Sequence, residues 1–153
     1  MMQTVAALAL ALAGAETAPL QDWKQPTPAV QIRGLAAYYR AGLMDEVARN
    51  RGMDLAGYAG GVALMRAGDL GRSVWIQVPA GTSAASEATL WEGPFLVVDC
   101  SRADHYAANV DRGHVVELAR STWLAFGLPE WPVTVTVRFL PPWSPAPHRT
   151  WPR

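Results

Sequence analysis

The chain has 153 residues, enough for one domain that buries a core of its own. Its 13 acidic and 13 basic side chains balance, so no net field attracts nucleic acid or an anionic membrane. We therefore expect no nucleic-acid partner. Cys100 is the single cysteine, which excludes an intramolecular disulfide.

The N-terminus carries an apolar run from Val5 to Ala13, followed by the small-residue triplet Ala13-Gly14-Ala15. This pattern is typical of a cleaved signal peptide, although no Lys or Arg precedes the run. A frayed apolar helix or a misplaced start site is the alternative. The run is too short to span a bilayer, and no cysteine follows it for lipid attachment. We expect residues 1–15 to direct export to the periplasm, cell wall or medium, without a stable membrane anchor.

Proline-rich segments flank the rest of the chain. Proline removes a backbone donor and biases the preceding residue away from helix, so residues 16–31 are predicted to form an extended linker. Residues 141–153 combine prolines with two tryptophans and are predicted to form a disordered or polyproline-like tail. A docking motif for a proline-binding module is the alternative for the tail. The folded domain is then expected over residues 32–140.

Most of the predicted domain consists of strands. Short segments that are rich in β-branched or aromatic residues and bounded by turn residues predict strands at 34–40, 60–65, 73–79, 94–100, 114–119 and 133–140. In the last of these, Val133, Val135, Val137 and Phe139 share one face. The first strand ends in paired tyrosines, which a pleated strand directs to opposite faces.

Two segments predict short helices. Residues 42–52 place Leu43, Met44, Val47 and Ala48 on one stripe and end at Gly52. Residues 121–127 begin with Ser121 as a candidate N-cap and end at Gly127. Six strands and two short helices in a domain of this size indicate a small barrel.

The order of these segments resembles the RlpA-like and expansin-like double-psi β-barrel family. The similarity rests on "GLAAYY" at the start of the domain, then "GRSVWIQV", "VVDCS" and "GHVVELARSTWLAFG". In this comparison Asp99 falls on the family's catalytic aspartate and Glu117 on the acid of its "DLS" element. The resemblance implies a mainly β fold, a six-stranded double-psi barrel with two short α-helices, that binds or cleaves cell-wall polysaccharide, most commonly the glycan strands of peptidoglycan.

The chain departs from the family pattern in two places. "EGPF" puts Glu92 where RlpA proteins carry the aspartate of "DRGPF", and "GLAAYY" contains no carboxylate to serve as a general base. Inverting hydrolysis needs two carboxylates with room for water between them. The missing carboxylate argues against inverting hydrolysis but is compatible with a lytic transglycosylase, in which one acid protonates the glycosidic oxygen and a hydroxyl of the substrate captures the cationic centre. Both departures weaken the hypothesis of an enzyme relative to that of a non-catalytic binder.

Asp99 is the candidate general acid, because it ends an apolar strand whose surroundings favour the protonated carboxyl. The residues expected to bind the sugar are Tyr38, Tyr39 and Trp91 as an aromatic floor, with His105 and Glu117 at the groove edge. The alternative for Asp99 is a carboxylate that only bonds the backbone at a strand end. The matching alternative for the protein is a polysaccharide-binding or wall-loosening module without hydrolytic activity.

Other reactive groups near Asp99 have simpler interpretations. The period of a strand places Phe95, Val97 and Asp99 on one face and turns Cys100 inward, where apolar neighbours make a thiol inert. A nucleophilic Cys100 paired with His105 or His114 is the less favoured alternative. No acidic or histidine spacing matches a zinc or calcium site, so we expect no metal and no cofactor, and the chain is expected to be a monomer.

Overall fold

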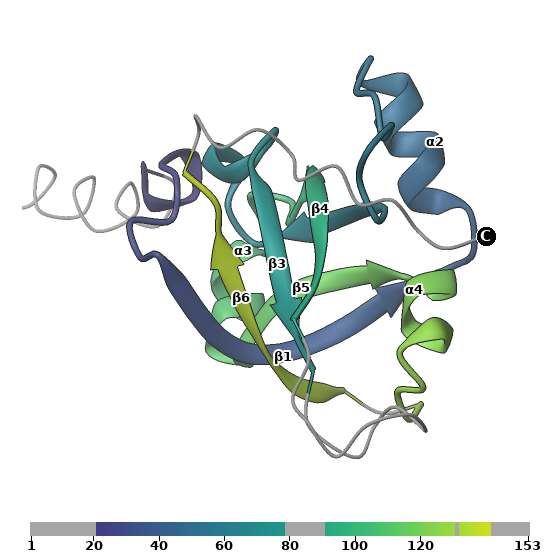
Figure 1. Cartoon of the computed structure of the whole chain (residues 1–153). Coiled ribbons are helices and arrows are strands. Elements are labelled where there is room, and N and C mark those ends of the chain that lie inside the picture. The colour runs from purple at the N-terminus through teal and green to yellow at the C-terminus, as the bar shows by residue number, and fades with distance from the viewer. Residues whose placement is uncertain (1–20, 79–90, 131, 142–153) are drawn as a thin grey trace, which may run out of the picture.

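The computed structural model describes residues 21–78, 91–130 and 132–141. Six strands close into one barrel in the order β1-β5-β2-β4-β3-β6, which confirms the prediction of a mainly β, barrel-shaped domain (Figure 1). The strands are β1 (Gln31–Tyr39), β2 (Gly61–Leu64), β3 (Ser73–Gln77), β4 (Trp91–Cys100), β5 (His114–Ala119) and β6 (Val133–Phe139). Each of the six predicted strands is present, with bounds that differ by a few residues.

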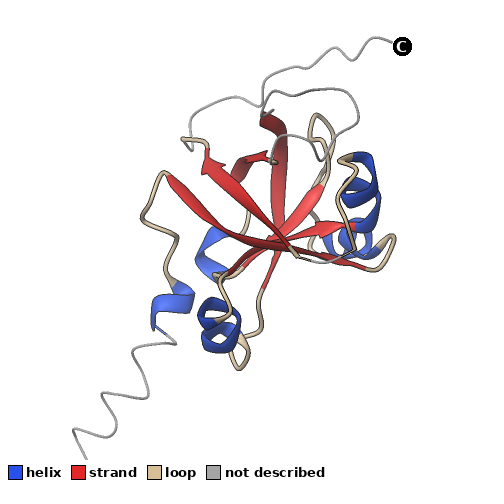
Figure 2. Cartoon of the chain, turned by 90° about the horizontal axis from the view of Figure 1, so that it is seen from below, coloured by secondary structure: helices blue, strands red, loops and turns tan. Residues whose placement is uncertain are grey.

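Besides a helical turn at residues 21–24, three longer α-helices and a short 3₁₀ helix in the described parts of the chain lie outside the ring of strands (Figure 2). They are α2 (Leu43–Asn50), α3 (Tyr106–Asp111), α4 (Arg120–Ala125) and η1 (Ala67–Asp69). Helices α2 and α4 confirm the two predictions, and both Gly52 and Gly127 have the positive φ of a helix-ending glycine. Ser121 is not the N-cap of α4, because the helix begins one residue earlier and its cap is Ala119.

Two apolar clusters stabilise the barrel. One fills its interior and includes the predicted inward face of β6, with Val135, Val137 and Phe139 almost fully buried. The other lies between the outer face of β2 and β4 and helix α2, where Met44 and Ala48 pack. The two tyrosines that end β1 contribute to different clusters, Tyr38 to the first and Tyr39 to the second, as the strand period predicted.

Parallel and antiparallel neighbours alternate around part of the barrel. β1 pairs with β5 and β2 with β4 in parallel, while β2 with β5 and β3 with β4 are antiparallel. β1 and β5 run in one direction, and β2 and β4 run together in the opposite direction. Glu117, near the end of β5, lies beside Ala63 of β2, which lies beside Asp99, near the end of β4, so both acids are brought to one place.

Part of the predicted linker belongs to the folded unit. Residues 21–24 are helical, and Trp23 donates a hydrogen bond from Nε1 to the carbonyl oxygen of Ser101 at 2.7 Å. The predicted signal peptide at residues 1–15 and all of the predicted tail except Pro141 lie outside the described residues. No described helix is both long enough and apolar enough to cross a membrane.

Candidate functional site

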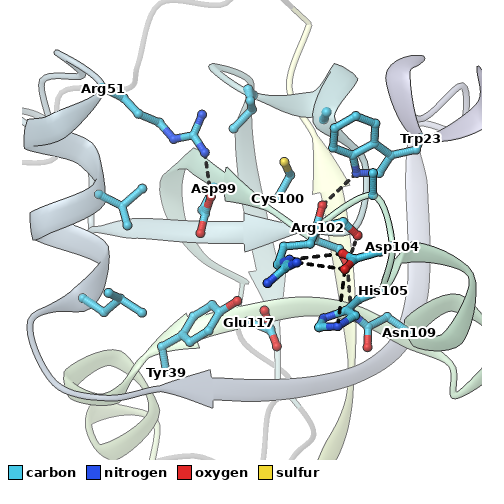
Figure 3. A pocket seen from close by; sticks show the side chains of 16 residues that line it. Trp23, Tyr39, Arg51, Asp99, Cys100, Arg102, Asp104, His105, Asn109 and Glu117 are labelled. Carbon is cyan, nitrogen blue, oxygen red and sulfur yellow. Dashed lines mark hydrogen bonds and ion pairs between the residues drawn. The ribbon is translucent and has the colours of Figure 1, made fainter. Parts of the chain in front are cut away.

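A cavity of about 770 Å³ opens between the C-terminal ends of β4 and β1, helix α2 and the loop that follows β4. Its lining includes Trp23, Tyr39, Arg51, Asp99, His105 and Glu117. Four of these six residues were predicted from the sequence to bind or cleave the ligand. Figure 3 shows Arg51 and α2 on one side of this cavity and Trp23 on the other.

A β-bulge determines where Asp99 points. In the pairing of β2 with β4, Val62 lies opposite Val97, but the next residue, Ala63, lies opposite Asp99. The extra residue, Val98, shifts the strand period, because a bulge sets two residues against one on the partner strand. Asp99 therefore shares the outer face with Ala63 and lines the cavity, as expected, whereas Phe95 and Val97, which were expected on the same face, lie in the barrel interior.

Glu117 lies on the other side of the same alanine. Ala63 is opposite Glu117 on β5 and opposite Asp99 on β4, so the two carboxylate residues flank it across three adjacent strands. Two strand spacings separate their Cα atoms by roughly 10 Å. Ala63 itself is fully buried in the cluster that packs against α2. The sequence predicted one catalytic carboxylate here, and the structure brings a second into the same cavity.

Arg51 holds the Asp99 carboxylate from above. It is the C-cap residue of α2, and its Nη2 donates to Oδ1 of Asp99 at 2.8 Å. The Asp99 side chain is 21% exposed, so the ion pair lies at the cavity wall. The sequence suggested an apolar setting for this acid, and the structure instead gives it a cationic partner from α2.

Tyr39 lies beside Glu117. Burial, and then the neighbouring Glu117 carboxylate, raise the pKa of the Tyr39 phenol above its ordinary value. Tyr39 therefore keeps its proton and can donate a hydrogen bond. Together, Tyr39 and Glu117 present one donor and one acceptor at the floor of the cavity.

The loop after β4 supplies the remaining polar wall. Arg102 donates to both carboxylate oxygens of Asp104, at 3.1 and 2.8 Å, and His105 Nε2 lies 3.9 Å from Asp104. Ser101 is buried and accepts a hydrogen bond from Asn109 of α3 at 2.9 Å. The sequence predicted this segment as a polar loop throughout, whereas α3 anchors its second half.

Cys100 is the main correction among the predicted roles. It was expected to point into the core, yet it is only half-buried and lines the cavity next to Asp99. Burial, and then the negative charge of Asp99, raise the pKa of the Cys100 thiol, while Arg51 opposes this shift. The raised pKa agrees with the expectation of an unreactive thiol. The expected position of the thiol, in the core, was wrong.

Two predicted aromatic ligands lie elsewhere. Tyr38 packs in the barrel core against Trp123, with ring centroids 4.9 Å apart, and under the guanidinium of Arg120 at 4.3 Å. Trp91 begins β4, nine residues before Cys100, and stacks with Arg138 at 4.1 Å. A strand advances about 3.3 Å per residue, so Trp91 is roughly 30 Å from the cavity. Neither residue lines it.

Three lining residues carried no signal in the sequence. Trp23 lies in the segment predicted as a linker, and Arg51 and Arg102 are arginines in exposed positions with no motif around them. The one indication in the sequence is Trp23 itself, a bulky aromatic residue between prolines, which suggests that this segment packs against the domain. Within the described parts of the chain, no three His, Cys, Asp or Glu side chains are grouped so as to hold a metal ion.

Comparisons with known proteins add no assignment. No protein-family model matches the chain, and no curated protein matches it.

Proposed function

We propose that this protein cleaves cell-wall polysaccharide, in particular the glycan strands of peptidoglycan, with Asp99 as the general acid. The observation that carries the proposal is the juxtaposition of Asp99 and Glu117 across Ala63, in an open cavity that also contains Tyr39. Carboxylates, a phenol and an aromatic wall are groups that bind sugar hydroxyls and ring faces. Asp99 opens onto the cavity, as a proton donor to a bound ligand must.

The same proposal includes the finer fold assignment, a double-psi barrel. The closed six-stranded barrel with two parallel strand pairs, β1 with β5 and β2 with β4, supports it. It is also supported by the order of the motifs along the chain, which resembles the RlpA-like and expansin-like family. Export to the cell wall belongs to this proposal and rests on the apolar N-terminal run.

The reaction that fits one acid is an intramolecular transfer. Asp99 gives its proton to the glycosidic oxygen, the bond from that oxygen to the anomeric carbon breaks, and the leaving chain departs as an alcohol. The 6-hydroxyl of the same sugar then bonds to the anomeric carbon and returns a proton to Asp99, so no water is consumed. Glu117 and Tyr39 hold the sugar hydroxyls during these steps. Arg51 bonds Oδ1 of Asp99 in the free protein, so the transferred proton is assigned to Oδ2.

The experiment is a digestion of purified, peptide-stripped glycan strands, with mass spectrometry of the soluble fragments. Wild type is expected to release fragments with anhydro ends, and Asp99→Asn none. Glu117→Gln is expected to retain reduced activity. Glu46→Gln serves as the matched control, because Glu46 is an exposed acid of α2 that pairs with Arg40 at 3.3 Å and does not line the cavity.

One observation favours a second candidate, a wall-binding module that does not cleave. Asp99 forms an ion pair with the Arg51 guanidinium at 2.8 Å, an arrangement typical of a carboxylate that binds and does not donate a proton. If neither wild type nor Asp99→Asn forms product, but both sediment with insoluble wall, this binding function replaces the enzymatic one. If wild type also fails to sediment, both functions are excluded.

A further inference from the structure

Residues 22–27, here called the N-terminal strap, cross the end of the barrel next to the cavity. Trp23 of this strap lines the cavity, and Nε1 of its indole donates to the carbonyl oxygen of buried Ser101 at 2.7 Å. This hydrogen bond satisfies the only polar atom of the side chain. The rest of the half-buried indole is an apolar ring at the cavity wall.

A buried charge fixes the far end of the strap. Asp69 of η1 is 1% exposed and accepts hydrogen bonds from the backbone N–H of Thr27 at 2.8 Å and from its hydroxyl at 2.6 Å. Arg72 donates from one nitrogen to Asp69 at 2.8 Å and to the carbonyl oxygen of Thr27 at 3.0 Å. Three hydrogen-bond donors surround this buried carboxylate, and two of them come from Thr27. These bonds hold Thr27 in a fixed position against the barrel.

A second contact fixes the strap close to Trp23. Asp22 forms an ion pair with Arg66 at 3.0 Å and accepts a longer hydrogen bond from the Tyr106 hydroxyl at 3.5 Å. Between the two anchors, the strap backbone lies directly on Gly68. A Cβ atom at Gly68 would overlap the backbone of Gln25 and Pro26. Trp23 is therefore held by fixed contacts on both sides.

We propose that Trp23 is a substrate-binding residue whose ring stacks on the apolar face of a pyranose, and that Asp69, Arg72 and Gly68 are positioning residues for it. This inference rests on the proposed polysaccharide function and adds a residue to its site. Trp23 lies across the cavity from α2 and Arg51, so a sugar chain that reaches Asp99 lies between them (Figure 3). It supplies the aromatic wall that Tyr38 and Trp91 do not, because both lie outside the cavity.

The test measures sedimentation of the full chain with insoluble, peptide-stripped wall glycan at increasing glycan concentration. Trp23→Ala is expected to bind about tenfold more weakly than wild type, the loss typical of one aromatic contact. Trp75→Ala is the matched control, since Trp75 is a half-buried tryptophan of β3 that does not line this cavity. It is expected to bind like wild type. Trp23→Leu keeps apolar bulk on the strap and is expected to bind as weakly as Trp23→Ala.

Gly68→Ala tests the positioning role separately. It moves the strap without altering a cavity side chain, so it is expected to weaken binding by a similar factor. In a double-mutant cycle, Gly68→Ala is expected to cause no further loss once Trp23 is Ala, because both changes remove the same contact. A general structural effect of Gly68→Ala would instead add to the loss in the Trp23→Ala background.

Three results overturn the inference. If wild type sediments with the glycan and both Trp23 variants sediment equally well, Trp23 is not a binding residue, and the proposed function stands without it. If the two losses add in the cycle, the positioning role is excluded. If wild type neither sediments with the glycan nor releases anhydro-ended fragments from it, the proposed function fails, and the inference that rests on it fails too.

Discussion

Asp99 and Cys100 are neighbours at the end of β4, and both line the cavity. The pKa of the Cys100 thiol therefore depends on the charged groups of the cavity. Burial is the largest cause of its raised pKa, the Asp99 carboxylate adds to it, and the Arg51 guanidinium opposes it. Cys100 thus reports the charge of the proposed catalytic carboxylate.

Asp99→Asn is expected to speed alkylation of Cys100 by iodoacetamide at pH 8. Removal of the negative charge lowers the thiol pKa, so a larger fraction is thiolate at that pH, by up to about tenfold for a shift of one unit. Arg51→Ala is expected to slow the reaction, since it removes the group that lowers this pKa. The chain has one cysteine, so mass spectrometry gives the rate without separating sites. Equal rates in all three proteins would show that the two charges do not act on the thiol.

The residue-level predictions failed where they depended on neighbouring strands. The strand period put Asp99 on the groove side and Cys100 in the core, and the structure departs from this at Cys100, which lines the cavity. The bulge at Val98 was not foreseen, because a bulge is defined by the partner strand and leaves no mark in the sequence of β4. Tyr38 and Trp91 were predicted to share a floor with Tyr39. Tyr38 lies on the opposite face of β1 from Tyr39, as the strand period itself requires, and Trp91 lies at the other end of β4 from Asp99.

At the scale of elements, the strap and η1 form a unit through the buried carboxylate of Asp69. Removal of the Asp69 carboxylate leaves the partly buried Arg72 guanidinium and the Thr27 N–H without this hydrogen-bond partner. The strap is thereby connected to the stability of the domain as well as to the cavity.

Asp69→Ala is expected to lower the free energy of unfolding by about 3 kcal/mol, the cost typical of breaking a buried ion pair. Urea unfolding of the full chain measures it. Glu46→Gln removes an exposed ion pair on α2 and is expected to cost less than about 1 kcal/mol. If Asp69→Ala lowers the free energy of unfolding as little as Glu46→Gln does, the Asp69 carboxylate does not hold the strap.

The elements themselves were predictable to different degrees. The strands and helices α2 and α4 were found because apolar residues recur with the period of each structure, as in the buried face of β6. Helix α3 was missed because Tyr106 is its one buried residue, so it shows no apolar stripe. The strap was missed because its prolines indicate a linker and its anchors lie more than forty residues away.

At the scale of the whole molecule, the barrel closes through β1, which pairs with β5 on one side and β6 on the other. Closure brings β1 very close to β5 at Gly34. A Cβ atom there would lie 2.5 Å from the carbonyl oxygen of Gly113 and 2.5 Å from a methyl group of Val115. Glycine at this position permits the approach of the two strands.

Gly34→Ala is expected to destabilise the barrel by about 1–3 kcal/mol, the range typical of overpacking. The thermal unfolding midpoint, followed by circular dichroism, should fall by several degrees. Thr134→Ala is the control, because Thr134 is exposed on the adjacent strand β6. An unchanged unfolding midpoint for Gly34→Ala would show that β1 and β5 can accommodate a Cβ atom at residue 34, contrary to the close contact described above.

The resemblance to double-psi barrels predicted the closed barrel, and the described strands confirm it at that level. The position of the cavity was not predictable from the same motifs. The cavity depends on the strand register that places Ala63 between Asp99 and Glu117. It also depends on α2, which packs on the outer face of β2 and β4, and on the strap at the end of the barrel. Each of these is a long-range contact between segments whose own patterns are unrelated.

The central claim is that this cavity holds a glycan chain, and nuclear magnetic resonance tests it most directly. The ¹⁵N-labelled full chain is titrated with soluble, peptide-free glycan oligosaccharides, and the amide shifts are mapped. We predict that the shifts concentrate around Trp23, Arg51, Asp99 and Glu117, and that β6 shows none. The absence of shifts at saturating glycan, or shifts confined to the side of Tyr38 and Trp123, would contradict the account.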